Sequence, residues 1–195
     1  MTEKSGVKRY GRILTQEFGK DQIEIQVHLA CILFQKGTPQ KELVDVNEVI
    51  REMIVLLRSE VTRYNVSIWT ELAADIPQVM ADRVQLQQVL MNLMLNGIDA
   101  MKDVEGSREL SIKSQRDEND QILVTVSDTG VGLPVQQADQ IFNAFFTTKL
   151  QGTGMGLPIS RSIIESHGGR LWVAENSPRG ASFHFTLPTK IEANE

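Results

Sequence analysis

The sequence predicts a two-layer α/β sandwich, with a mixed sheet and the helices on one face of it. Stretches with the period of amphipathic helices alternate along the 195 residues with stretches that show the two-residue period of strands. Some consecutive strands are separated only by a short polar turn, as in hairpins, whereas others flank a helix. Hairpins combined with helical crossovers favour this architecture.

The N-terminal residues are expected to lie outside the main domain. Residues 1–36 show no clean period and predict a tail that ends in a short helix, the remnant of a longer helical hairpin in one interpretation. Pro39 disfavours helix in the residue before it, so the main domain is expected over 37–190, with a short tail at 191–195.

The first elements of the domain are predicted from their caps and periods. Asp45 and Glu48 have the spacing of a capping box, and apolar residues recur at helical spacing over 46–64. Residues 66–72 alternate as in a strand, and 76–81 predict a short extended piece. The remaining elements are expected as a helix that opens at Asp82 and Gln85 and ends near Lys102, strands at 110–115 and 121–128, a helix that ends at His167, and strands at 171–174 and 182–187.

Composition excludes several classes of protein. A hydrophobic share of 41% and a charged share of 23% are typical of a globular chain. The formal charge of −5 lacks the basic excess that nucleic-acid binding uses. The apolar stretch Leu29–Phe34 is far shorter than the roughly 20 residues of a membrane helix, so no direct membrane insertion is expected. The single cysteine, Cys31, forms neither an internal disulfide nor a thiolate cluster, and a cytoplasmic location fits.

The helix predicted over 83–102 carries a narrow polar stripe on an otherwise apolar surface. The stripe consists of Gln85, Asn92, Asn96, Asp99 and Asp103. One interpretation is a face turned to water. The other is a row of amide and carboxylate oxygens directed at a hydrated cation or a polar ligand.

Asp128 ends a predicted strand whose apolar residues share its parity, so its carboxylate should point toward the buried side of the sheet. The glycines Gly130 and Gly132 remove side-chain bulk beside it, which would let a flat ligand approach while Asp128 accepts a hydrogen bond from an amino group. A plain turn rich in aspartate and glycine is the alternative.

A glycine-rich stretch, 152–156, directly precedes the last predicted helix. Such an entry presents free N–H groups and the positive end of the helix dipole to a phosphate, although the motif alone is weak. Upstream, three phenylalanines stand beside Thr147, Thr148 and Lys149. They predict a loop that folds over a ligand and contacts its phosphates, and a core cluster of phenylalanines is the alternative.

Taken in order, these stretches resemble the four sequence boxes of sensor histidine kinases. Residues 90–101 resemble the N box, 128–132 the first glycine box, 141–149 the F box and 152–157 the second glycine box. The stretches Ile163–Gly169 and Gly180–Phe183 also match that family, and the resemblance covers about residues 40–190. It implies a Bergerat-type ATP-binding fold.

The resemblance also implies roles for single residues. Asn96, with Asn92, would hold the Mg²⁺ that bridges the phosphates of ATP, and Asp128 would bind the adenine amino group. Gly130 and Gly132 would shape the adenine pocket. The residues implied to line the phosphates or to close over them are Thr148, Lys149, Gly152, Gly154, Met155, Gly156 and Leu157.

Two departures bear on the reaction. ATP-hydrolysing relatives of this fold use a glutamate one helical turn before the magnesium asparagine to activate water, whereas this chain has Asn92 there, which favours a transferase. An acceptor histidine with its usual acidic neighbour and downstream proline is not evident at His28, His167 or His184.

Three functions therefore stay open. The first is the ATP-binding catalytic domain of a sensor kinase, with a histidine-bearing dimerisation domain and a response regulator receiver domain as partners. The second is an ATP-binding regulatory module without catalysis. The third is a serine kinase of the anti-sigma-factor type, which needs no acceptor histidine.

Overall fold

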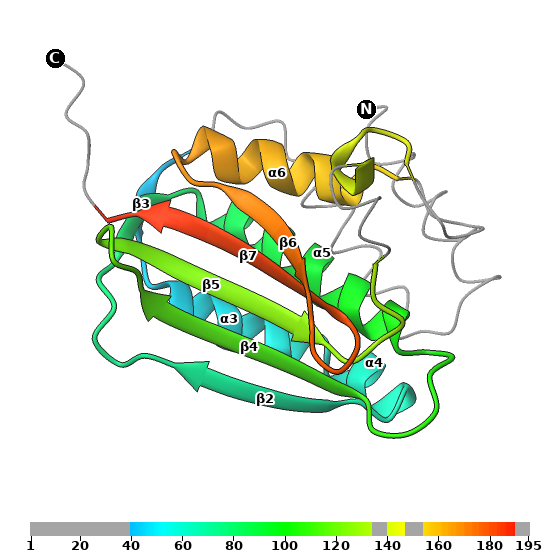
Figure 1. Ribbon diagram of the computed structural model, residues 1–195. Coiled ribbons are helices and arrows are strands. Elements are labelled where there is room, and N and C mark those ends of the chain that lie inside the picture. The colour runs from blue at the N-terminus through cyan, green and yellow to red at the C-terminus, as the bar shows by residue number, and fades with distance from the viewer. Residues whose placement is uncertain (1–39, 134–139, 147–153, 190–195) are drawn as a thin grey trace, which may run out of the picture. The chain divides into compact units, whose positions relative to one another are not determined.

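The computed structural model describes residues 40–133, 140–146 and 154–189 (Figure 1). The predicted tails at 1–36 and 191–195 lie outside the described residues. The domain boundaries expected from the sequence therefore stay predictions.

A five-stranded mixed sheet forms one layer of the domain, in the order β2-β4-β5-β7-β6. Its strands are β2 (Ser67–Leu72), β4 (Glu109–Arg116), β5 (Gln121–Asp128), β6 (Leu171–Glu175) and β7 (Ala181–Pro188). β2 runs parallel to β4, and the other neighbouring pairs are antiparallel. Both predicted hairpins and the mixed character of the sheet are confirmed.

The second layer consists of helices that lie on one face of the sheet (Figure 1). They are α3 (Val46–Leu56), α4 (Arg58–Arg63), α5 (Arg83–Ala100) and α6 (Gly156–Ser166), and a short 3₁₀ helix, η2 (Gln140–Phe142), precedes α6. The predicted α/β sandwich with its helices on one face is confirmed. None of the described helices is both long and apolar enough to cross a bilayer.

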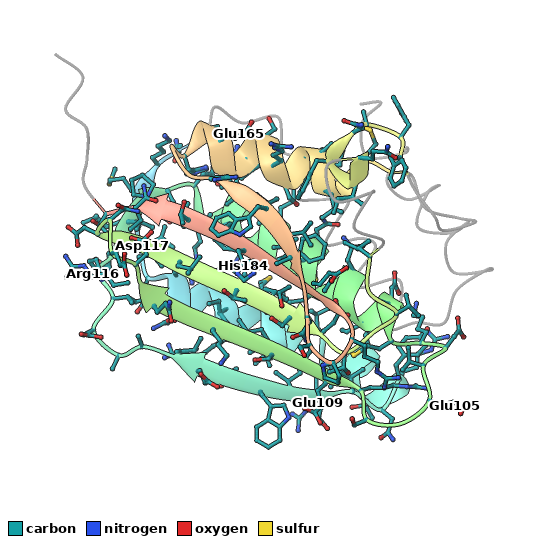
Figure 2. All side chains as sticks on the ribbon, viewed as in Figure 1. Glu105, Glu109, Arg116, Asp117, Glu165 and His184 are labelled. Carbon is teal, nitrogen blue, oxygen red and sulfur yellow. The ribbon has the colours of Figure 1, made fainter. Side chains whose placement is uncertain are left out.

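The core lies between the two layers. Alternate residues of β4 and β5 are buried against the helices, as the two-residue period requires, whereas in β7 residues of both parities are buried. The largest fully buried side chains include Phe185 from β7 and Leu86, Leu90, Leu93 and Met94 from α5. His184 alternates with the core phenylalanines of β7 and lies on the face of the sheet that the helices leave uncovered (Figure 2).

α3 and α5 each begin at an aspartate cap, as predicted. Asp45 accepts hydrogen bonds from the N–H groups of Asn47 and Glu48, and Asp82 accepts one from Gln85 N–H at 3.0 Å. The reciprocal half of the capping box is not formed at Asp45, because Glu48 instead binds Arg83 of α5 at 3.3 Å.

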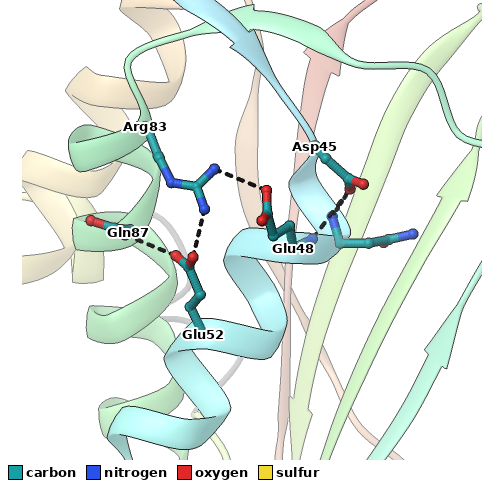
Figure 3. Close-up of polar contacts among 6 residues, drawn as sticks. Asp45, Glu48, Glu52, Arg83 and Gln87 are labelled. Atoms are coloured by element: carbon teal, nitrogen blue, oxygen red, sulfur yellow. Dashed lines mark hydrogen bonds and ion pairs between the residues drawn. The ribbon is translucent and has the colours of Figure 1, made fainter.

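Arg83 joins α3 to the start of α5 (Figure 3). Its guanidinium donates to Glu52 at 2.6 Å and to Glu48 at 3.3 Å, and Gln87 donates to the second oxygen of Glu52 at 3.1 Å. These contacts hold α5, which carries the polar stripe, against α3.

Two local features differ from the sequence prediction. The helix expected over 46–64 is divided at Leu57, whose buried side chain stays in the core while its backbone leaves helical geometry. The second feature is β1 (Glu42–Val44), which pairs with β3 (Val79–Ala81) to form a separate two-stranded sheet. A three-residue strand has too short a pattern to be recognised by its period.

His167 ends α6 and connects it to α5. Its Nε2 accepts the Asp82 N–H at 2.9 Å, so its Nδ1 carries the proton and donates to the Ile163 carbonyl at 2.8 Å. Gly168, at φ +74°, and Gly169 then complete the predicted glycine cap, with Gly169 N–H bonded to Ile164 O at 3.0 Å.

Candidate functional site

Asp128 lies at the end of β5 with its carboxylate buried, as its parity predicted. It is 3% exposed, and its Oδ1 accepts hydrogen bonds from Gly130 N–H at 2.8 Å and from Ala181 N–H at 3.4 Å. Within the described part of the chain, no side chain donates to the second oxygen, Oδ2. That oxygen is available to a ligand that offers a hydrogen-bond donor.

Burial raises the pKa of the Asp128 carboxyl above its ordinary value, and the N–H groups of Gly130 and Ala181 offset part of the rise. The site therefore holds a carboxylate whose charge is costly and incompletely solvated. A donor on a bound ligand would lower that cost, which is a physical reason for a ligand to bind at this point.

The main chain of Asp128 is held as firmly as its side chain. Asn176, in the loop between β6 and β7, donates from Nδ2 to the Asp128 carbonyl at 2.7 Å. Gly180 packs against the same carbonyl so closely that an added Cβ would lie 1.9 Å from its oxygen, and its φ of +105° also favours glycine. Sequence reasoning assigned no role to Asn176, which stands 48 residues from Asp128.

The first glycine box packs directly on α5. An added Cβ on Gly130 would lie 2.6 Å from the carbonyl oxygen of Ala100, and that carbonyl accepts a hydrogen bond from Val131 N–H at 3.2 Å. Gly97 of α5 faces the sheet, where an added Cβ would lie 2.7 Å from Leu110 and 3.8 Å from Asp128 Oδ2. Small residues on α5 thus bring the helix beside the aspartate.

The polar stripe of α5 is half-buried between this carboxylate and α6. Asn92 donates from Nδ2 to the Ser160 hydroxyl of α6 at 3.0 Å, and Asn96 donates from Nδ2 to Asn92 Oδ1 at 3.4 Å. Asp99 pairs with Lys102, whereas Asp103 is exposed. The stripe is therefore not a freely solvated face at Asn92 and Asn96.

The N-terminus of α6 lies against Asn92. Gly156 is the first residue of the helix, and an added Cβ there would lie 2.3 Å from Asn92 Oδ1. Met155 provides no side-chain cap, and Gly154 adopts a φ of +65° just before it. The start of α6 thus lies directly beside the Asn92 amide, and its free N–H groups are available to an anion bound at the same point.

The donor set beside Gly156 suits a hard cation. Amide oxygens are ligands that Mg²⁺ accepts, and the ion commonly takes only one or two protein ligands together with nucleotide phosphates and water. Among the residues that the structure describes, no group of three His, Cys, Asp or Glu side chains could hold a metal by itself. A phosphate-bridged Mg²⁺ on Asn92 and Asn96 fits the residues present.

Some predicted site residues cannot be placed. Thr148, Lys149 and Gly152 lie outside the described residues, whereas Met155 and Leu157 lie at the start of α6. Phe145 is 77% exposed at a φ of +66°, so the core interpretation does not hold for this phenylalanine. Its backbone N–H binds Gly154 O at 3.1 Å, which joins the F box to the second glycine box.

A known family of ATPases matches the part of the sequence that contains this site. Residues 81–191 match the model of the histidine kinase-, DNA gyrase B- and HSP90-like ATPases. The matched stretch contains α5, both glycine boxes and the last hairpin, and so every predicted site residue.

Curated relatives are sensor kinases. The chain is 42% identical over 157 residues to the sensor protein FixL of Bradyrhizobium diazoefficiens, covering 80% of this chain and 31% of the relative. It is 32% identical over 186 residues to sporulation kinase E of Bacillus subtilis, covering 95% of this chain and 24% of the relative. The chain thus spans less than a third of the length of these relatives.

Solved structures show the same fold. The catalytic domain of histidine kinase ThkA superposes with a TM-score of 0.68 at 38% identity, covering 76% of this chain and 95% of that domain. ThkA in complex with the response regulator protein TrrA superposes with a TM-score of 0.69 at 30% identity, covering 97% of this chain and 53% of that chain.

Proposed function

The chain belongs to the family of histidine kinase-, DNA gyrase B- and HSP90-like ATPases, and on that premise we propose that it is the catalytic part of a sensor histidine kinase. In this proposal it binds Mg²⁺ and ATP and transfers the γ-phosphoryl group to a histidine on a dimerisation domain. A nitrogen–phosphorus bond forms, and the bond from the γ-phosphorus to the ADP oxygen breaks. A cytoplasmic location belongs to the same proposal.

The observation that carries the proposal is the buried carboxylate of Asp128 beside α5. Its open Oδ2 would accept a hydrogen bond from the adenine amino group, and Gly97 and Gly130 let α5 and the loop after β5 pack closely around the carboxylate. The adenine amino group would supply the hydrogen-bond donor that the buried carboxylate lacks. Adenine should therefore bind with higher affinity than a base without an amino group at that position.

The phosphate end of the nucleotide would lie between α5 and the start of α6. Asn92 and Asn96 would hold Mg²⁺ through their amide oxygens, and the N–H groups at Gly156 and Leu157 would face the phosphates. Bound Mg²⁺ would neutralise charge on the leaving phosphate. The chain's own contribution to catalysis is to hold the phosphates in line with an acceptor.

Transfer is favoured over hydrolysis by the surroundings of Asn92. Its amide has no basic oxygen, and both of its polar atoms already bind Ser160 and Asn96. It therefore cannot take a proton from an attacking water as a carboxylate would.

The two described histidines support an acceptor elsewhere. His167 is 5% exposed and uses both ring nitrogens, on Asp82 and Ile163. His184 lies on the opposite face of the sheet from α5, stacks on Trp172 and contacts Thr125 through Nδ1. Burial also lowers the pKa of His184. Neither side chain could meet the γ-phosphate of a nucleotide bound at Asp128 of the same chain.

The partners proposed are a histidine-bearing dimerisation domain and a response regulator receiver domain. The complex of ThkA with TrrA supports the second partner, because ThkA is 30% identical to this chain in that structure. The family match supports the first indirectly, since the phosphoryl group needs an acceptor that the described residues do not offer.

The test is incubation of the purified chain with Mg²⁺ and γ-labelled ATP, followed by measurement of retained nucleotide and of acid-labile phosphate on protein. Retained nucleotide without label is expected for the chain alone, and label is expected on an added histidine-bearing dimerisation domain. Failure to retain ATP would refute the nucleotide site. Hydrolysis at a steady rate without any labelled acceptor would refute the transferase assignment.

A further inference from the structure

Ser160 is a buried polar residue that neither the glycine boxes nor the N box includes. It lies one turn inside α6, is 1% exposed, and its hydroxyl accepts a hydrogen bond from Asn92 Nδ2 at 3.0 Å. A buried hydroxyl facing the core would ordinarily be replaced by an apolar group, so this bond requires an explanation.

The Asn92 amide directs its nitrogen at Ser160 and its oxygen at Asn96. On its other side Asn96 donates to Asn92 Oδ1 at 3.4 Å, so the Asn92 oxygen faces Asn96 and its nitrogen must face Ser160. With the amide reversed, two NH₂ groups would face each other. Ser160 and Asn96 thus hold Asn92 from both ends.

The orientation places Asn92 Oδ1 at the start of α6, where an added Cβ on Gly156 would lie 2.3 Å away. The bond from Asn96 is long for a neutral hydrogen bond, and a cation at Oδ1 could replace it. The bond to Ser160 points the other way and can persist when a cation binds.

We propose that Ser160 is a positioning residue for the magnesium site: its hydroxyl holds the Asn92 amide with the oxygen directed at the cation. This inference rests on the proposed function, because it assumes that Mg²⁺ and ATP bind between α5 and α6. It adds a link from α6, the helix that begins at the second glycine box, to the metal ligands on α5.

Removing the Ser160 hydroxyl should weaken nucleotide binding in the presence of Mg²⁺ more than nucleotide binding in its absence. In Ser160→Ala the Asn92 nitrogen loses its buried acceptor, so the amide can turn and withdraw its oxygen. We define the magnesium enhancement as the dissociation constant of AMPPNP in EDTA divided by that in excess Mg²⁺. It should fall about fivefold in Ser160→Ala, with the EDTA value nearly unchanged.

The measurement is calorimetric titration of wild-type and variant chains with AMPPNP in both buffers. Ser166→Ala is the matched control, because its hydroxyl lies on the same helix but binds the helix's own Ile163 carbonyl at 2.7 Å. A double variant tests the route: in an Asn92→Ala background, Ser160→Ala should leave the magnesium enhancement unchanged.

Each other outcome overturns the inference. Equal losses in both buffers would show that Ser160 only supports the packing of α6, and an unchanged enhancement would show that Asn92 needs no anchor. Additive losses in the double variant would exclude a route through Asn92. A wild-type chain that binds no AMPPNP in either buffer would instead refute the proposed function itself, and the inference with it.

Discussion

The two halves of the candidate site are built differently. In the half proposed to bind adenine, around Asp128 and called the adenine half below, the closest contacts come from the main chain: the N–H groups of Gly130 and Ala181 bind the carboxylate, and Gly180 packs on the Asp128 carbonyl. In the half proposed to bind Mg²⁺, around Asn92 and called the magnesium half below, the contacts are between the side chains of Asn92, Asn96 and Ser160.

This difference predicts that the adenine half is rigid, whereas the magnesium half can rearrange its side-chain contacts. A main-chain frame within a sheet cannot move without breaking strand pairing, so the adenine half is in place before a ligand arrives. In the magnesium half, the contacts are single hydrogen bonds between side chains of α5 and α6, so one partner, such as the Asn96 amide on Asn92 Oδ1, can be exchanged without moving the backbone. If the proposed roles hold, separate substitutions should therefore alter the choice of nucleotide and the coordination of the metal.

The largest contrast is expected between two glycine substitutions. Gly180→Ala would place a Cβ 1.9 Å from the Asp128 carbonyl oxygen at a positive φ, whereas Gly156→Ala would place one 2.3 Å from the Oδ1 atom at the end of the Asn92 side chain. The first should lower the free energy of unfolding by about 3 kcal/mol and the second by about 1 kcal/mol or less. Urea denaturation followed by circular dichroism measures both, and equal losses would remove the distinction between the halves.

The second effect concerns Asp128→Asn. Loss of the charged acceptor should weaken AMPPNP binding about a hundredfold, since hydrogen bonds to charged groups contribute about 1.5–3 kcal/mol. Calorimetric titration measures the loss, and Asp103→Asn, at an exposed position beyond the end of α5, is the control that should bind normally.

The same variant should not be less stable without nucleotide. Because the folded pKa of Asp128 is raised, the folded chain binds protons more tightly than the unfolded chain, and its stability falls as pH rises through the window above 3.8. Asparagine removes that cost and still accepts from Gly130. A large loss of stability at pH 7 would mean that the charge supports the fold.

The direction of Asp128 and several parts of the fold could be predicted because their signals are local. The parity of a single strand gave the direction of Asp128, and the aspartate caps at Asp45 and Asp82 marked two helix starts. Each of these depends on residues within one element. The roles of the predicted residues toward ATP came from the family resemblance and stay proposals.

The rest could not be predicted because it depends on contacts between distant segments. Ser160 stands 68 residues from Asn92, and neither has a sequence signal that names the other. Asn176 has the sequence surroundings of an ordinary turn residue, which do not indicate its contact with Asp128. The helix break at Leu57 contains no proline or glycine and is visible only once the helix packs on the core.

A smaller effect is expected from Asn176→Ala. The variant loses the 2.7 Å bond that holds the Asp128 carbonyl, so the carboxylate should lose part of its alignment with the adenine amino group. ATP affinity should fall about fivefold, and affinity for purine ribonucleoside triphosphate, which lacks the amino group, should fall less. Asn119→Ala, in the exposed β4–β5 turn, is the matched control. An equal fall in affinity for both nucleotides would show that the substitution only loosens the loop between β6 and β7.

The smallest effect is a pH dependence that belongs to the adenine half alone. The ionised Asp128 carboxylate accepts a hydrogen bond from the adenine amino group more strongly than the protonated carboxyl does. Because its pKa is raised, Asp128 becomes protonated earlier as the solution is made more acidic, and the free energy of that contact is then reduced. The affinity for ATP relative to purine ribonucleoside triphosphate should therefore fall as pH is lowered through that pKa. Protonation of the phosphates affects both nucleotides alike and cancels in this ratio, as does any change in the magnesium half. A ratio that stays constant down to the acid limit of folding would show that Asp128 does not contact the amino group directly. Because the adenine ring is itself more basic than unsubstituted purine, only a ratio that falls in the wild-type chain more than in Asp128→Asn would assign the pH dependence to Asp128.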